Sequence, residues 1–170
     1  MLQIIPMIII CLKKKHIMRR NEREIKDRQE IEAIIQRAEV CRVGFSENNT
    51  PYIVPMNFGY KDNCLYFHCA AEGRKLDIIR RNNTVCFEID IDYELVKSPD
   101  KICSWGAKYR SVMGSGKAFI IGDTKEKSDA LNIITRHYGA GTHDFSGEET
   151  EKINIIKVLI ENMTGKKTGY

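Results

Sequence analysis

The sequence predicts a mainly β (α+β) fold, a small antiparallel barrel of about six strands with peripheral helices. Two observations lead to this prediction. Apolar residues recur at every second position in several separate segments, which is typical of half-buried strands. Helical periodicity occurs in only two or three segments, and strands and helices do not alternate regularly, which excludes a doubly wound parallel sheet.

The composition is that of one soluble domain. A chain of 170 residues can bury a core without disulfides, and 42% hydrophobic with 29% charged residues is ordinary for a globular protein. The net charge of +4 is small and no arginine-rich block is interleaved with aromatic residues, so we expect no nucleic-acid partner. The six cysteines form no C-x-x-C pair and have no histidine at metal-ligand spacing. We therefore expect reduced thiols, no metal site and a cytoplasmic protein.

Residues 1–17 differ from the rest of the chain. An apolar run, Leu2–Leu12, precedes Lys13–Lys15, which is the reverse of the order in a signal peptide. The run is also shorter than the roughly 20 residues that span a bilayer, so we expect no membrane partner. We interpret residues 1–17 as an upstream mis-start or a disordered tail; a membrane-surface anchor is the alternative. One domain then covers residues 18–166, and residues 167–170 form a tail.

The first predicted helix covers Asp27–Glu39. Its start has the form of a capping box, in which Asp27 is the acceptor and Glu30 reaches back. Its apolar stripe follows at helical spacing and consists of Ile31, Ile34, Ile35 and Ala38. A strand, Val40–Ser46, and a turn at residues 47–51 come next.

The segment Tyr52–Tyr60 predicts a half-buried strand, because its alternate residues are large and apolar. Pro55 cannot donate to a ladder, so the strand is either bulged there or lies on an edge. In both cases unpaired backbone groups are available to a ligand. The turn Lys61–Asn63 and a second strand, Cys64–Cys69, complete the predicted hairpin.

A short helix, Arg74–Arg81, is predicted after Gly73. The free N–H groups at its start and the side chains of Arg74 and Lys75 favour an anion such as phosphate. The alternative is a solvated basic helix attached to an ordinary hairpin.

The strand Thr84–Tyr93 has one apolar face and carries Glu88, Asp90 and Asp92 on the other. These carboxylates fit either a divalent metal or a solvated outer face. We favour the solvated face, because every second residue of an exposed strand face points the same way. A loop, Leu95–Ser104, follows.

A long strand, Lys108–Ile121, is predicted next. Gly114 and Gly116 inside it mark a bend or a close approach by a ligand or another backbone. Arg110 and Ser111 suit a phosphate or a carboxylate. The alternative is a bent barrel strand with an exposed arginine.

The remaining predictions concern the C-terminal third. A helix begins at Asp123 or Thr124 and continues to Tyr138. Residues 139–147 form a loop of the kind that can cover a site. The last strand is Ile153–Glu161, and Gly165–Tyr170 is a basic tail without a structural signal.

Two segments together carry a resemblance to a known family. They read EVCRVGFSENNTPYIVPMNFGYKDNCLYFHCAAEGRKLDIIRRNNTVCFEID and WGAKYRSVMGSGKA. The chain resembles the pyridoxamine 5′-phosphate oxidase-related flavoproteins, and among them the 5-nitroimidazole-resistance (Nim) proteins, from Met18 to about Lys166. The resemblance implies a six-stranded split β-barrel with Greek-key connections. It also implies a homodimer that binds FMN between its two subunits.

The resemblance also implies site residues, carried over by position. The strand that lies along the isoalloxazine with its backbone facing the ring is Val54, Pro55, Met56 and Asn57. The adjoining wall is Phe67, His68 and Cys69, and the phosphate is held by Arg74 and Lys75. The residues near the ribityl chain and phosphate are Tyr109, Arg110, Ser111 and Val112. The basic set with which the family's oxidases bind pyridoxal phosphate has no match here.

His68 is the candidate catalytic residue, since an imidazole beside a flavin can supply a proton while the reduced ring delivers hydride or electrons. The alternative is a purely structural histidine. The expected function is FMN-dependent reduction of a small-molecule electrophile such as a nitroaromatic, with NAD(P)H as a transient donor; FAD could replace FMN. The alternative function is flavin binding or storage without turnover, or haem handling on the same barrel.

Overall fold

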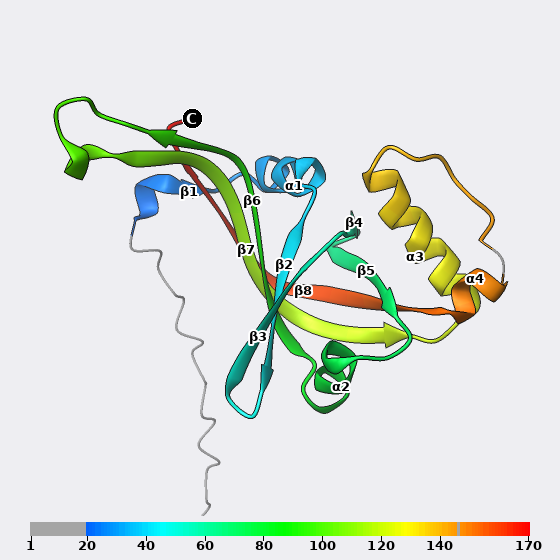
Figure 1. Cartoon of the computed structure of the whole chain (residues 1–170). Helices are drawn as coiled ribbons and strands as arrows, with labels where there is room; N and C mark the ends of the chain where they lie inside the picture. The colour runs from blue at the N-terminus through cyan, green and yellow to red at the C-terminus, as the bar shows by residue number, and fades with distance from the viewer. Residues whose placement is uncertain (1–19, 146) are drawn as a thin grey trace, which may run out of the picture.

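The computed structural model describes residues 20–145 and 147–170, so the predicted tail at residues 1–17 lies outside the described residues. Within them, eight strands form one antiparallel sheet (Figure 1). The order is β3-β2-β6-β7-β8-β5-β4, and β1 pairs with β8. The strands are β1 (Glu24–Ile25), β2 (Cys41–Glu47), β3 (Thr50–Met56), β4 (Gly59–Lys61), β5 (Cys64–Ala70), β6 (Thr84–Val96), β7 (Gly106–Ile121) and β8 (Ile153–Thr168).

The helices lie around the sheet, as predicted (Figure 1). They are α1 (Arg28–Arg37), α2 (Arg74–Arg81), α3 (Thr124–His137) and α4 (Gly147–Glu151), with short 3-10 turns η1 (Asn21–Arg23) and η2 (Ile102–Ser104). None of the helices in the described part of the chain is long and apolar enough to cross a bilayer.

The sheet curls into a split barrel that does not close. Its end strands, β3 and β4, do not pair with each other. Beyond the end of β8, β6 and β7 continue as an arm (residues 93–108) at the upper left of Figure 1. The predicted architecture is therefore confirmed, with eight strands instead of six. The difference arises because the predicted strand Tyr52–Tyr60 is broken into β3 and β4, and because β1 was not predicted.

The core lies between α1 and the inner face of the sheet. Alternate residues of β2 and β6 point inward, so that Val43, Phe87 and Ile89 are almost fully buried. The predicted apolar stripe of α1, which includes Ile34 and Ile35, covers them. Burial of each such side chain contributes about 1.5–3 kcal/mol, so this cluster fixes α1 on the barrel.

The N-terminus of α1 is capped as predicted, but without the reciprocal contact. The Asp27 carboxylate accepts a hydrogen bond from the backbone N–H of Gln29 at 2.9 Å. Glu30 does not reach back. Its carboxylate accepts instead from Lys167 Nζ at 2.7 Å, because β8 continues past the start of α1.

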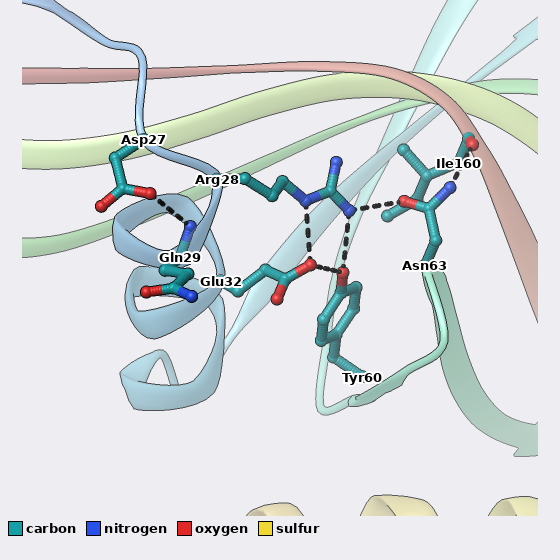
Figure 2. A network of polar contacts seen from close by, with 7 residues as sticks. All are labelled: Asp27, Arg28, Gln29, Glu32, Tyr60, Asn63 and Ile160. Atoms are coloured by element: carbon teal, nitrogen blue, oxygen red, sulfur yellow. Dashed lines mark hydrogen bonds and ion pairs between the residues drawn. The ribbon is translucent and has the colours of Figure 1, made fainter.

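A polar network attaches α1 to the β4–β5 turn and to β8 (Figure 2). Arg28 donates through Nε to Glu32 at 2.8 Å and through its terminal nitrogen to Asn63 at 2.9 Å. The Tyr60 hydroxyl donates to the same Glu32 carboxylate, and Asn63 donates to the Ile160 carbonyl at 2.8 Å. The hydrogen bond from Arg28 lowers the pKa of Glu32.

Glu88 and Asp90 of β6 lie on the outer face, as predicted, whereas Asp92 lies at a register shift where the alternation of the strand is interrupted. All three carboxylates are paired with arginines. Arg42 on β2 contacts both Glu88 and Asp90. Arg37 at the end of α1 contacts Asp92 at 2.6 Å. Burial, and secondarily the charge of Asp90, raise the pKa of Glu88.

Of two predictions for the second half of the sheet, the bend in β7 is right and the C-terminal tail is wrong. The bend at the glycines of β7 is confirmed, since the β7–β8 register shifts between Ser115 and Gly116. The unstructured tail Gly165–Tyr170 is wrong, because β8 runs to Thr168 and pairs with β7 and β1. The pairing there is made by backbone groups, so the side-chain pattern does not reveal it. Glycine fits at position 165 because a Cβ would lie 2.7 Å from Ile31 Cγ1.

Candidate functional site

The start of α2 has the free amides that an anion site needs. Gly73 has φ of +138°, a conformation that favours glycine, and nothing within 4 Å faces the position of its missing Cβ. The amides of Leu76 and Asp77 both donate to the Gly73 carbonyl, at 2.9 and 3.3 Å. The amides of Arg74 and Lys75 donate to no other described residue, so they are available to a ligand.

Two cationic side chains stand at this helix start. Arg74 donates through Nε to Glu47 at 3.2 Å, and its guanidinium lies 4.5 Å from the centre of the Tyr52 ring. Lys75 is half-buried and forms no hydrogen bond or ion pair within the described residues. Burial raises the pKa of the Cys69 thiol and the Lys75 cation opposes this rise, which places Lys75 near the end of β5.

The start of α2 therefore lies between β3 and β5, since Arg74 reaches Tyr52 on β3 and Lys75 reaches Cys69 on β5. Figure 1 shows α2 below the barrel, beside the β2–β3 hairpin. The predicted phosphate residues and two predicted strands are thus brought together.

β3 lies on the edge of the sheet, which is the second of the two alternatives predicted from Pro55. Its register with β2 runs without interruption from Met56 to Thr50, so there is no bulge. Val54 and Met56 are half-buried against the core, whereas Ile53 and Pro55 point outward. The outer edge of β3 pairs with no described strand, which leaves backbone groups open to a ligand.

The end of β3 is held by Tyr138, at the C-terminal end of α3. Its hydroxyl accepts from the Phe58 amide at 3.0 Å and from Asn57 Nδ2 at 3.2 Å, and donates to the Glu39 carbonyl at 2.7 Å. His137 ends α3, and the centre of its ring lies 4.4 Å from that of the Phe58 ring. These contacts fix the point where the chain crosses from β3 to β4.

The three predicted residues of β5 do not share one orientation. Phe67 and Cys69 point into the core and are 1% and 8% exposed. His68 points outward and is exposed, with no hydrogen-bond partner in the described chain. Of these three side chains, only the His68 imidazole is free to meet a ligand.

The residues Tyr109–Val112 lie away from this group in the same chain. They belong to the first half of β7 and pair with the last residues of β8, from Thr168 to Gly165. The part of β7 near α2 is its other end, where the Ala118 amide donates to the Asn83 carbonyl just after that helix. Arg110 is held by Asp92, and its guanidinium lies 3.9 Å from the centre of the Tyr170 ring. Val112 is fully buried. A single chain therefore does not bring all the predicted site residues together.

Sequence reasoning missed two residues that shape the site. Glu47 belongs to a predicted turn, and Tyr138 is only the last residue of a predicted helix. Both act on residues distant in sequence, Glu47 on Arg74 and Tyr138 on Phe58. No local pattern signals such contacts.

Comparisons with known proteins identify relatives of this architecture. The family model described as pyridoxamine 5′-phosphate oxidase matches residues 27–167. A solved structure of a candidate 5-nitroimidazole antibiotic resistance protein from Bacteroides thetaiotaomicron VPI-5482 is 39% identical. That match covers 85% of this chain and 86% of the other, with a TM-score of 0.75. Among curated proteins, none matches this chain.

Two more distant structures share the fold. The flavocytochrome Anf3 from Azotobacter vinelandii is 20% identical with a TM-score of 0.80, over 93% of this chain and 75% of that one. An FAD-binding protein from Mesorhizobium loti is 20% identical with a TM-score of 0.64, over 86% and 98%. At these identities the likeness concerns the split barrel alone.

Proposed function

This chain belongs to the pyridoxamine 5′-phosphate oxidase family, and from this premise we propose that it is an FMN-binding oxidoreductase that reduces a small electrophile such as a nitroaromatic. The proposal rests mainly on the arrangement of groups at the start of α2. Free amides and the unpaired Lys75 cation lie there, beside the open edge of β3. This arrangement suits a ligand with a phosphate at one end and a flat ring system at the other.

The residues present fit the phosphate of a flavin nucleotide. The first-turn amides of α2 and the side chains of Arg74 and Lys75 would hold it. The backbone of Val54–Asn57 would face the isoalloxazine, because β3 has no outer neighbour within the described chain. Bound FMN would supply the hydride or electrons for the reduction, with NAD(P)H as a transient donor. FAD remains the alternative cofactor.

We propose further that a second copy of the chain completes the site. Tyr109, Arg110 and Ser111 lie at the base of the β6–β7 arm, where they pair with the end of β8. They are seven or more residues before Ala118, the part of β7 that meets the end of α2 of the same chain. In a homodimer the arm of one protomer would reach the partner's α2. Large apolar side chains are exposed along this arm, which supports burial against a partner. They are Tyr93, Leu95, Val96, Ile102 and Trp105.

His68 is proposed as the proton donor. Its ring is exposed on β5, the strand whose end lies near Lys75, and has no partner within the described chain, so it is free to approach a substrate. An imidazole can transfer a proton near neutral pH, which matches the need of a reduced electrophile for a proton. Phe67 and Cys69 on either side would hold the strand through their buried side chains.

Flavin binding without turnover is the competing function, and haem handling is a third. We consider haem because the fold is similar to that of a flavocytochrome. The absorption spectrum of the purified protein distinguishes these functions. We expect flavin bands that bleach when NADH or NADPH is added without oxygen, and that return on addition of a nitroaromatic. A flavin spectrum that never bleaches would support storage, and a Soret band would support haem. A colourless protein that does not bind added FMN would overturn the proposal.

A further inference from the structure

Glu47 forms ion pairs with two arginines of α2. It ends β2, and its side chain is 24% exposed. One carboxylate oxygen accepts from Arg74 Nε at 3.2 Å, and the other lies 3.1 Å from a terminal nitrogen of Arg81. These arginines belong to the first and last turns of α2, so a single carboxylate pairs with one cation at each end of the helix.

The contact with Glu47 fixes how Arg74 presents its guanidinium. The Nε side is taken by the carboxylate, and one face of the group lies over the Tyr52 ring. The two terminal nitrogens of Arg74 donate to no other described residue. These nitrogens can bind two oxygens of a phosphate at once, which is the geometry that arginine provides best.

The same carboxylate also acts against the ligand. A phosphate monoester carries about 1.5 to 2 negative charges at pH 7. Any phosphate bound by Arg74 lies one guanidinium away from Glu47, and like charges at such a separation repel even through solvent. Glu47 therefore holds Arg74 in place and at the same time reduces its attraction for a dianion. Arg81 opposes the second effect, because its cation partly neutralises Glu47.

We propose that Glu47 is a positioning residue that orients Arg74 toward the phosphate of the cofactor and sets the affinity of the site for phosphate charge. The proposal rests on the proposed function, since it assumes a flavin nucleotide at α2. It predicts that Glu47 and Arg81 act with opposite sign on a phosphorylated flavin and have no effect on a flavin that lacks the phosphate.

The test measures dissociation constants of FMN and riboflavin by quenching of flavin fluorescence. In Glu47→Gln the amide oxygen still accepts from Arg74 Nε, but the negative charge is gone. We expect FMN to bind about fivefold more tightly and riboflavin to bind as in the wild type. In Arg81→Gln the carboxylate loses its second cation, so FMN should bind about fivefold more weakly, again with riboflavin unchanged. Glu22→Gln is the control, because Glu22 is exposed in η1, far from α2 in Figure 1.

Three results would overturn the proposal. FMN affinity that is unchanged or weaker in Glu47→Gln would show that the charge of Glu47 does not limit binding. Equal changes for FMN and riboflavin would show a general structural effect. An effect of the same size in Glu22→Gln would trace the change to net charge. Arg81→Gln keeps the proposal testable if Glu47→Gln does not fold. A wild-type protein that binds neither flavin would instead refute the proposed function itself.

Discussion

At the scale of single residues, Lys75 differs from the other cations of α2. The three arginines of this helix each contact a carboxylate, whereas Lys75 has no such partner in the described chain. An unpaired, half-buried ammonium group beside free amides is poised for an anion from outside the chain. The charge that remains available for a ligand at this site is therefore mainly that of Lys75.

We predict that Lys75→Gln weakens FMN binding about tenfold, because one charge-assisted hydrogen bond to the phosphate is lost. Riboflavin should bind as in the wild type. Calorimetric titration of both ligands measures the effect. Lys26→Gln serves as the matched control, since Lys26 is exposed and lies outside the site. Equal losses for the two flavins would contradict a phosphate contact.

His68 provides a second residue-scale prediction. Its side chain points outward between two buried neighbours, so alanine should leave the packing of β5 intact. We expect His68→Ala to retain its flavin and to lose about a hundredfold in turnover of a nitroaromatic, as is usual when a general acid is removed. Turnover is measured per bound flavin in an anaerobic assay. Normal turnover with the flavin in place would rule out the proton-donor role.

At the scale of elements, the strands differ in how much of them local pattern could predict. The cap at Asp27 and the alternation in β6 arise from neighbours in sequence, so α1 and β6 were located closely. The alternation in Tyr52–Tyr60 also continues without a break, because Phe58 points inward like Met56. The interruption there is imposed by the Tyr138 hydroxyl, 80 positions later, and no local pattern contains it.

The same reasoning applies to the site. Gly73, Arg74 and Lys75 are consecutive, so their common role at a helix start could be predicted from the sequence. The contact between Glu47 and Arg74 joins the end of a strand to a helix 27 positions away. Such a contact follows from the packing of α2 along the β2–β3 hairpin, which only the folded chain reveals.

Tyr138 should be important for the stability of the β3–β4 crossover. We predict that Tyr138→Phe lowers the free energy of unfolding by about 1–3 kcal/mol, because the Phe58 amide and the Glu39 carbonyl lose a hydrogen-bond partner. Urea unfolding followed by circular dichroism measures this change. Tyr93→Phe should have little effect, since Tyr93 is 66% exposed and its hydroxyl forms no hydrogen bond within the described chain. Similar losses in both variants would refute the role of the hydroxyl.

The bend of β7 yields another prediction at this scale. A Cβ at Gly116 would collide with the backbone carbonyl of Leu159 on β8, whereas a Cβ at Gly106 would meet nothing within 4 Å. Gly116→Ala should therefore lower the melting temperature by at least about 10 °C, since backbone atoms of a sheet cannot move aside cheaply. Gly106→Ala should melt within about 2 °C of the wild type. Equal melting temperatures would mean that β7 and β8 separate easily.

At the scale of the whole molecule, the two halves of the predicted site lie far apart in space within one protomer. The α2 group is below the barrel in Figure 1, whereas Arg110 lies on the first half of β7, paired with Lys167 near the end of β8. The proposed symmetric dimer would resolve this separation, because the arm of each protomer would then contribute to the α2 site of the other. Two identical sites would result, each built from both chains.

This arrangement predicts complementation between two defective variants. Lys75→Gln and Arg110→Gln should each bind FMN weakly when expressed alone, since every site in the dimer lacks one phosphate contact. When the two chains are co-expressed and pair at random, half of the dimers are mixed, and each mixed dimer has one site with both residues intact. About a quarter of all sites should then bind FMN with wild-type affinity, which a titration detects as a separate tight phase. Weak binding throughout would place Lys75 and Arg110 in the same protomer's site, or Arg110 outside the site altogether. Mixing either variant with itself gives the baseline, because no intact site can form.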